Sequence, residues 1–366
     1  RTGDRWDDVL HRARFVLTIH NLGYQGLFDP ALLPELGVDP DLYHWEGIEF
    51  HGRFSFLKAG ILYTDLVTTV SPTYAREIQR PEFGHGLDGL LRSRGDRLAG
   101  IINGVDYEEW DPEKDPHIKR SFSPSRMLGK ATDKAEVRRL FGLEKRKGAP
   151  LVGVVSRLAH QKGIDLLLDA APRIFARGGQ LVILGTGDPA LEAAVTRLAA
   201  ANPGCCGARI GFDLELSDQI LAGADIVPVP SRYEPCGLTH LYGMKYGAVP
   251  VARATGGLKD TVTDYDGPGG EGTGFLFTEA TAAALGEALE RALDLYASPK
   301  KHRGRRLWNA LRARAMTRDW SWDRAAGDYL ALYSRLATDR EVVLARPEPA
   351  GESRRAPPPQ ATPPPP

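Results

Sequence analysis

The stretch Val229-Pro230-Ser231-Arg232-Tyr233-Glu234-Pro235-Cys236-Gly237-Leu238-Thr239 decides how the chain is interpreted. It follows an apolar run at 224–230 that predicts a buried strand, and it precedes a run at 238–246 that predicts a helix. The stretch is therefore expected at the carboxyl edge of a parallel sheet, where ligands bind and where a helix amino terminus offers N–H groups to an anion. Glu234, beside Pro235 and close to Gly237, can accept hydrogen bonds from sugar hydroxyls there, although a solvated glutamate in an ordinary turn gives the same local pattern.

Length, charge and cysteine content exclude several classes of protein. The 366 residues suffice for two domains, and 47 basic residues cancel 47 acidic ones, so no electrostatic argument favours a nucleic acid or an anionic membrane as partner. Three cysteines, two of them adjacent, give no disulfide framework and favour a reducing compartment. No run approaches the roughly 20 apolar residues of a membrane span. The first residues contain neither an initiating Met nor a signal peptide, so we expect the chain to be an incomplete gene product.

Apolar runs that predict strands alternate with helical runs along most of the chain. Alternation of this kind predicts parallel, doubly wound sheets. Between residues 111 and 147 the composition becomes charged and contains prolines, which favours a domain boundary, and from residue 345 onward Pro, Ala, Arg and Glu predict a disordered tail. The expected strands are 14–19, 65–70, 98–102, 151–155, 181–184, 208–212, 224–230 and 249–252. The expected helices are 54–62, 217–222, 238–246, 282–316 and 320–336, together with two helices that end at residues 176 and 201.

Polar and glycine-rich segments follow several of these strands. Arg157 and Lys162 come directly after the strand at 151–155, and two cations beside a backbone turn can neutralise a diphosphate, although surface cations are common. Thr255, Gly256 and Gly257 form an N–H-rich turn that suits either a phosphate or a plain tight loop. The single Gly185-x-Gly187 pattern lacks the third glycine of a dinucleotide fingerprint, which disfavours a dehydrogenase.

Two further strand ends carry candidate ligands in the first half of the chain. His20 lies in His20-Asn21-Leu22-Gly23-Tyr24-Gln25-Gly26 and can bond a ligand hydroxyl or a nearby carbonyl, and Asn103 can serve a ligand or cap its turn. No His, Cys and Asp pattern has metal-ligand spacing. We therefore expect neither a metal nor another cofactor.

Seven motifs in one order resemble those of the bacterial glycogen synthases and plant starch synthases. The resemblance covers residues 14 to about 335. The motifs are Thr18 to Gly26, Lys58-Ala59-Gly60, Val70 to Ala75, Asn103 to Asp106, Ser156-Arg157-Leu158 with Gln161-Lys162-Gly163, Pro230 to Thr239, and Thr255 to Leu258.

The resemblance implies a retaining glycosyltransferase of GT-B type that moves glucose from ADP-glucose to the non-reducing end of an α-1,4-glucan, in the cytoplasm of a bacterium. It implies an α/β fold of two Rossmann-like domains facing across a cleft, the first of them incomplete. The expected bounds are 1–140 for the acceptor-side domain, 141–318 for the nucleotide-sugar domain, 319–340 for a helix that packs back on the first domain, and 341–366 for the proline-rich tail.

Residue roles follow from the same resemblance. It implies that Arg157 and Lys162 bind the diphosphate, that Glu234 holds the donor glucose, and that His20 and Asn103 lie near that sugar. Phe212 stands where the family usually has a tyrosine that stacks on the adenine. The other positions that the resemblance assigns to the glucose or the phosphate are Cys236, Gly237, Leu238, Thr239, Thr255, Gly256 and Gly257.

The chain departs from the family pattern at its start. The family begins with a Lys-x-Gly-Gly-Leu loop that contributes to donor binding, and this loop is absent before Arg1. The absence leaves open whether the chain as given is active. A transferase that uses UDP-glucose and a non-catalytic glucan- or nucleotide-binding fragment are therefore the alternatives.

Overall fold

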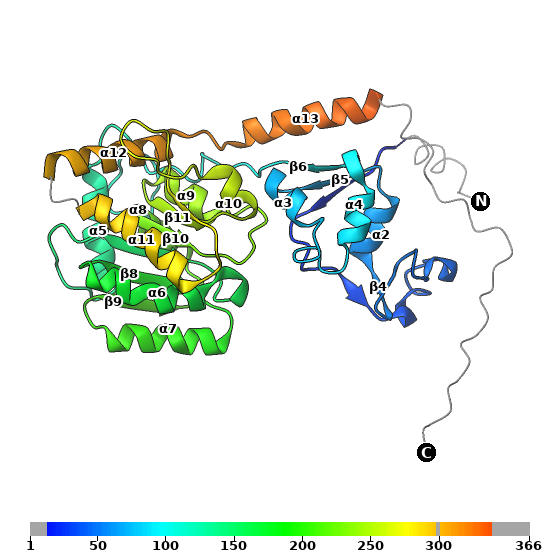
Figure 1. Ribbon diagram of the computed structural model, residues 1–366, viewed down its shortest axis with the longest axis horizontal. Helices are drawn as coiled ribbons and strands as arrows, with labels where there is room; N and C mark the ends of the chain where they lie inside the picture. Colours follow the sequence, from blue (N-terminus) through cyan, green and yellow to red (C-terminus); the bar gives the residue numbers. More distant parts are fainter. Residues whose placement is uncertain (1–12, 298–300, 339–366) are drawn as a thin grey trace, which may run out of the picture.

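The computed structural model describes residues 13–297 and 301–338, without the side chains of 301–303. Two units lie side by side, and helix α13 (Trp322–Thr338) runs from the larger unit along the smaller one (Figure 1). No helix among the described residues is long and apolar enough to cross a membrane. The proline-rich tail expected at 341–366 lies outside the described residues, as do the first 12 residues of the acceptor-side domain.

The larger unit is built on six parallel strands in the order β12-β11-β10-β7-β8-β9. Five of the strands overlap the predicted positions, although β9 begins and ends two residues earlier than predicted, and β12 was not predicted. Their bounds are β7 (Leu151–Val155), β8 (Gln180–Gly185), β9 (Cys206–Ile210), β10 (Ile226–Val229), β11 (Val249–Arg253) and β12 (Phe275–Phe277).

Helices cover both faces of this sheet, as expected for a doubly wound fold. Leu181 and Ile183 of β8 pack in the core shared with α6 (Ile164–Ala176) and α11 (Ala282–Ala297). Val182 points to the other face and packs with α5 (Leu128–Leu140) and α8 (Leu214–Gly223). Successive residues of a strand point to opposite faces of the sheet. Because helices cover both faces of β8, all of its residues are buried and most of its sequence is a continuous apolar run.

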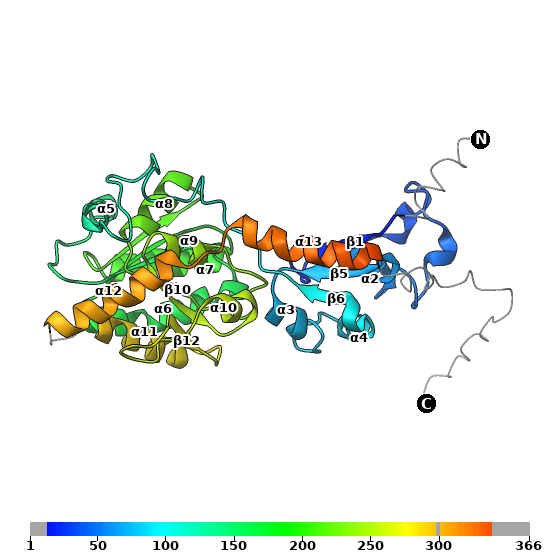
Figure 2. The same ribbon diagram turned by 90° about the horizontal axis from the view of Figure 1, so that it is seen from above.

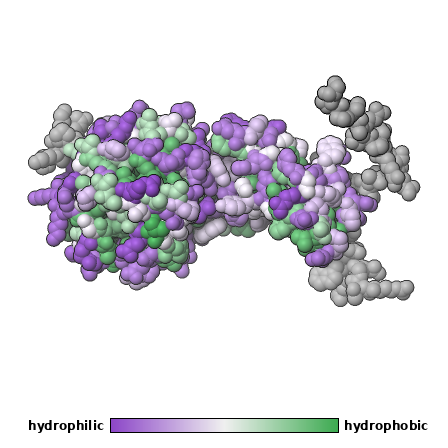
Figure 3. Space-filling view, turned by 90° about the horizontal axis from the view of Figure 1, so that it is seen from below, coloured by the Kyte–Doolittle hydropathy of each residue, from purple (hydrophilic) through white to green (hydrophobic). Residues whose placement is uncertain are grey.

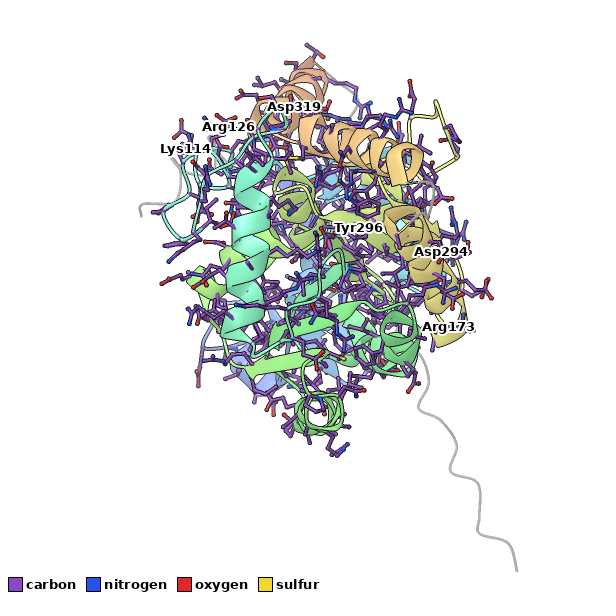
Figure 4. The ribbon with its side chains drawn as sticks, turned by 90° about the vertical axis from the view of Figure 1, so that its left-hand side faces the viewer. Lys114, Arg126, Arg173, Asp294, Tyr296 and Asp319 are labelled. Carbon is purple, nitrogen blue, oxygen red and sulfur yellow. The ribbon has the colours of Figure 1, made fainter. Side chains whose placement is uncertain are left out.

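Helix α5 was not predicted, because its sequence is charged. Two of its lysines are buried in the larger unit: the Lys134 ammonium donates to Asp225 Oδ2 at 2.5 Å and to the Tyr296 hydroxyl at 2.9 Å, and the Lys130 ammonium donates to Tyr246 O at 2.7 Å. Tyr296 belongs to α11, so its hydrogen bond to Lys134 joins α11 to α5; Figure 4 labels Tyr296. The predicted boundary at 140 coincides with the end of α5, although α5 packs on the larger unit. The bounds of the domains stay a prediction.

The smaller unit contains a parallel sheet in the order β1-β5-β6, with β1 (Val16–Ile19), β5 (Leu66–Thr69) and β6 (Leu98–Gly100). A second sheet is antiparallel and consists of β2 (Leu27–Phe28), β4 (Arg53–Ser55) and β3 (Glu49–Phe50). The helices of this unit are α2 (Phe56–Tyr63), α3 (Pro72–Glu77) and α4 (Asp88–Ser93). The Ser71 hydroxyl caps α3 by accepting from Tyr74 N at 2.8 Å, as the Ser-Pro pair predicts.

Helix α13 buries Ala325, Leu332 and Leu336 in a cluster with Leu66 of β5 and Ile101. Figure 2 shows this helix lying over β1 and β5. The remaining helices of the larger unit are α7 (Pro189–Ala201), α9 (Thr239–Lys245), α10 (Gly256–Thr261) and α12 (Lys301–Thr317). The chain therefore crosses between the units twice, once before α5 and once through α13.

Candidate functional site

The order of the strands in the larger sheet reverses between β7 and β10. The chain runs from β7 outward to β8 and β9, then returns with β10 beside β7, where Ile226 pairs with Val152. In open parallel sheets such a switch point leaves a crevice at the carboxyl ends of the two strands. The loops that leave these two ends carry Lys162 and Glu234, the residues predicted to bind diphosphate and glucose.

Lys162 and Glu234 meet at this point. The Lys162 ammonium donates to Glu234 Oε2 at 2.6 Å, and the Ser231 hydroxyl donates to the same oxygen at 2.8 Å. The Glu234 side chain is 6 % exposed and the Lys162 side chain is 20 % exposed. Two opposite charges in such a poorly hydrated place neutralise each other, and a ligand that replaces water there interacts with both at low dielectric.

Close backbone packing holds the two loops together. Gly163 has a φ of +65°, and a Cβ at this position would overlap the carbonyl oxygen of Pro230. Arg232 N donates to Gln161 O at 2.8 Å, and the Arg232 guanidinium binds both oxygens of Asp165 at 2.8 and 2.6 Å. This bidentate pair lowers the pKa of the Asp165 carboxyl. The separation of Lys162 and Glu234 is therefore fixed by the packing around it.

A pocket lies between these loops and the start of α9. Lys162, Ser231 and Glu234 line it together with residues predicted to meet the glucose and phosphate, which are Gly237, Leu238 and Thr239. Gly237 has a φ of +78°, so the backbone turns sharply below Glu234 in a conformation that favours glycine.

His240 also lines this pocket and was not predicted. Its Nε2 lies 2.6 Å from the Thr261 hydroxyl, which itself donates to Gly257 O, so Nε2 carries the proton and donates to Thr261. Burial lowers the pKa of His240 to about 3, which keeps the ring neutral. Its buried Nδ1 then remains an acceptor without a protein partner.

Three of the predicted residues that lie outside the pocket are exposed, namely Arg157, His20 and Phe212. The exposed Arg157 guanidinium donates to the hydroxyl of Tyr24, from the smaller unit, at 3.0 Å. His20 is exposed at the end of β1. Phe212 is 82 % exposed, two residues beyond the end of β9, because that strand stops earlier than predicted. The ring of Phe212 is thus free to stack on a planar group.

Asn103 and Cys236 come together across the two units. The Cys236 thiol is buried, and burial raises its pKa to about 12, so it stays protonated near neutral pH. The backbone N–H of Asn103 donates to its sulfur. This contact places Asn103 beside the segment that carries Glu234.

Thr255, Gly256 and Gly257 form the start of helix α10 rather than the expected loop. Gly257 N donates to Glu234 O at 3.1 Å, and both Gly256 N and the Thr255 hydroxyl donate to Glu77 of the smaller unit. In this structure these donors are engaged within the protein. None of them faces the pocket.

The structure also groups three residues with metal-binding side chains, Asp115, His117 and Asp218, none of which lines the pocket. Sequence spacing did not indicate this cluster, because about a hundred residues separate Asp218 from the others. His117 Nδ1 lies 2.7 Å from Asp218 Oδ2, and the two Asp115 oxygens accept from His117 N and from the Tyr246 hydroxyl. We interpret the cluster as a hydrogen-bonded link between the segment before α5 and helix α8.

Sequence reasoning missed the partners of the predicted residues. Ser231 and Tyr233 lie inside the motif from Pro230 to Thr239, and Tyr24 lies inside the motif from Thr18 to Gly26. Their closeness in the sequence to Glu234 and His20 is the signal that could have identified them. The Tyr233 ring meets the ring of His85 edge-on, with centroids 5.7 Å apart, and joins the core of the smaller unit. Contacts between units need the fold before they can be predicted.

Comparisons with known proteins agree with this geometry. Residues 1–93 match the model of the starch synthase catalytic domain, and residues 138–305 match that of glycosyl transferases group 1. The glycogen synthase of Anaeromyxobacter dehalogenans (strain 2CP-C) is 52 % identical over 331 residues, which are 90 % of this chain and 68 % of that protein. The glycogen synthase of Serratia proteamaculans (strain 568) is 47 % identical over 332 residues, 89 % of this chain and 68 % of that protein.

A solved structure gives the same assignment. The catalytic domain of starch synthase IV from Arabidopsis thaliana, bound to ADP and acarbose, matches with a TM-score of 0.85 and 33 % identity, over 92 % of this chain and 70 % of that one. Its likeness extends over both units described above. The chain therefore belongs to the glycogen synthase family of glycosyltransferases and has the GT-B fold.

Proposed function

We propose that this chain transfers glucose from ADP-glucose to the non-reducing end of an α-1,4-glucan with retention of configuration. The observation that carries the proposal is the ion pair of Lys162 and Glu234 in the pocket at the switch point. A cation there can meet a diphosphate, and a carboxylate beside it can meet the hydroxyls of a sugar. The starch synthase structure bound to ADP and acarbose supports a nucleotide and a glucan as the two ligands.

Lys162 and Arg157 neutralise the diphosphate in this proposal. Each charge-assisted hydrogen bond contributes about 1.5–3 kcal/mol, and more of this is realised as negative charge builds on the departing phosphate. The backbone of Gly237, Leu238 and Thr239 faces the same pocket. The adenine stacks on the exposed ring of Phe212.

Glu234 orients the donor glucose. Both protein donors reach its Oε2, so Oε1 can accept from a sugar hydroxyl. The bond from the anomeric carbon to the phosphate oxygen breaks while a bond to the acceptor hydroxyl oxygen forms on the same face. The hydroxyl proton passes to the leaving phosphate, so the step needs no protein nucleophile, and His20 and Asn103 are assigned to the glucosyl group.

The proposal includes no metal and no other cofactor, because two protein cations supply the positive charge at the diphosphate. A chelator should then leave the transfer rate unchanged. A bacterial cytoplasmic location is also part of the proposal and is supported by three free cysteines.

The first experiment is a calorimetric titration of the chain with ADP and, separately, with UDP, repeated on Lys162→Ala. Tighter binding of ADP that weakens by about one to two decades in the variant supports the proposed site and donor. Lys147→Ala, which removes an exposed lysine on the same unit, is the matched control and should bind as the wild type does. Tighter binding of UDP refutes ADP-glucose as donor.

Activity is measured as transfer of labelled glucose from ADP-glucose to glycogen. Incorporation that disappears in Lys162→Ala and Glu234→Ala, while both variants keep their circular dichroism, supports the site assignment. Normal rates in both variants refute it. A folded chain that binds ADP but transfers no glucose supports the alternative of a non-catalytic binding fragment.

A further inference from the structure

Two short helices from different units lie against each other where the units meet. These are α3 of the smaller unit and α10 of the larger one, and they are adjacent in both Figure 1 and Figure 2. Figure 3 shows a narrower waist between the two units on the face seen from below. Individual contacts at this place can therefore decide how the units sit relative to each other.

The first contact runs from α3 to the start of α10. The carboxylate of Glu77 accepts from the Thr255 hydroxyl at 3.0 Å, and its two oxygens both accept from Gly256 N at 3.1 Å. A carboxylate at a helix amino terminus satisfies donors that have no partner inside the helix and interacts favourably with the helix dipole.

The second contact runs in the opposite direction, from α10 to the start of α3. Asp260 Oδ2 accepts from Thr73 N at 2.8 Å, and Asp260 Oδ1 accepts from the Thr73 hydroxyl at 2.6 Å. The carboxylate at the end of each helix thus caps the beginning of the other helix. Such reciprocal capping requires an antiparallel pair in one register, so it fixes both the distance and the orientation of the two units.

The capped end of α10 is bonded directly to the catalytic loop. Gly257 N donates to Glu234 O at 3.1 Å and to Pro235 O at 3.2 Å, and a Cβ at Gly256 would overlap the carbonyl oxygen of Glu234. The backbone of Glu234 therefore rests on the same turn that Glu77 holds from the other unit. A change in the position of α3 is transmitted to Glu234 through one layer of hydrogen bonds.

We propose that Glu77 and Asp260 are positioning residues that clamp the two units together and thereby set the Glu234 loop for glucosyl transfer. They do not contact the pocket and act through Thr73, Thr255 and Gly256. Opening the clamp separates His20 and Asn103 of the smaller unit from the pocket of the larger one. The kinetic part of this inference rests on the proposed function, whereas its structural part does not.

The structural part is tested by small-angle X-ray scattering of the full chain and of Glu77→Ala, Asp260→Ala and the double variant. Losing one charge-assisted hydrogen bond should shift the ratio of open to closed molecules by about tenfold or more. The radius of gyration should rise in each single variant and further in the double variant. Glu82→Ala, an exposed glutamate of the same unit, is the matched control and should scatter as the wild type does.

The kinetic part is tested by measuring kcat and the affinity for ADP separately. Because the nucleotide site lies on the larger unit, ADP affinity should stay within about twofold, while kcat should fall about tenfold or more in Glu77→Ala. Glu77→Gln keeps one acceptor oxygen and should recover part of kcat. An equal loss of ADP affinity and kcat would indicate damage to the larger unit and overturn the inference.

The two proposals fail in different ways. If the wild type transfers no glucose but Glu77→Ala still increases the radius of gyration, the clamp stands and the transferase proposal fails. If the variants scatter as the wild type does and retain its kcat, the clamp is refuted and the transferase proposal stands. Circular dichroism of each variant shows that the helices are intact before either comparison is made.

Discussion

Removing the ammonium of Lys162 should destabilise the larger unit as well as weaken ligand binding. Lys162→Met keeps most of the side-chain volume but leaves the Glu234 carboxylate buried without its cation. Breaking a buried ion pair by removing one partner costs about 3–5 kcal/mol. We expect the low end, about 3 kcal/mol, because the Lys162 side chain is 20 % exposed and the Ser231 hydroxyl still donates to the carboxylate at 2.8 Å.

This cost translates into a measurable shift of the melting temperature. For units of 150–250 residues each kcal/mol corresponds to about 2–4 °C, so Lys162→Met should melt about 6–12 °C lower by calorimetry at neutral pH. The double variant Lys162→Met/Glu234→Gln replaces the unpaired charge by a neutral amide of the same shape. It should melt several degrees higher than Lys162→Met alone.

Comparing the two variants shows whether the unpaired Glu234 carboxylate or a general loss of packing lowers the melting temperature. If the double variant is no more stable than Lys162→Met, the destabilisation does not come from the unpaired carboxylate. If Lys162→Met melts within 2 °C of the wild type, on the scale of about 2–4 °C per kcal/mol, the carboxylate is hydrated and the low-dielectric description of the pocket is wrong.

Three further predictions follow from exposed groups. Arg157→Ala should weaken ADP binding about tenfold or more in calorimetry, because it removes one charge-assisted hydrogen bond. Its melting temperature should stay unchanged because the guanidinium is exposed, and a large loss of stability would contradict that expectation. Phe212→Ala should weaken ADP binding by about 1–3 kcal/mol, the range for a base stacked on an aromatic ring, while the neighbouring control Leu214→Ala should not; equal affinities of the two variants would exclude stacking. The hydrogen bond to Asp218 raises the pKa of His117, so its stabilisation is complete below the unfolded pKa of about 6.5 and is lost as pH rises through the higher folded pKa. The gap in melting temperature between wild type and His117→Asn should therefore narrow from pH 6 to pH 8, and a constant gap would refute the assignment.

Most elements of the larger sheet were predicted because a buried parallel strand has a strong and local signal. Strands β7, β8 and β10 are continuous apolar runs, and each is followed by a helix of regular period. Strand β12 has only three residues and follows a glycine-rich segment, so no such run exists to be recognised. Helix α5 was missed for a different reason, because its lysines are buried by bonds to carbonyl and carboxylate oxygens from distant segments.

The pairing of Lys162 with Glu234 was within reach of the sequence, because parallel topology brings the ends of neighbouring strands to one edge. The sequence could not show which group the hydrogen-bond donors of Thr255, Gly256 and Gly257 face. A turn rich in N–H groups predicts an acidic partner, and in this structure its donors bond the carboxyl group of Glu77 from the other unit; the assignment of these residues to the substrate stays a prediction. The residue types of this turn indicated an acidic partner, but they could not show whether that partner is a bound ligand or a side chain of the protein.

The two units contribute unequally to the proposed site. The charged pair and the pocket walls come from the larger unit, whereas His20 and Asn103, which the proposal assigns to the glucosyl group, come from the smaller one. Because Lys162, Arg157 and Phe212, the residues assigned to the nucleotide, all belong to the larger unit, we expect that unit to bind ADP without the smaller one. In the proposed function transfer needs both units in register, because the groups assigned to the sugar lie on opposite sides of their junction. We therefore expect variants that open the clamp to keep their affinity for ADP and to lose transfer, and measuring ADP affinity and kcat on the same variants tests this expectation.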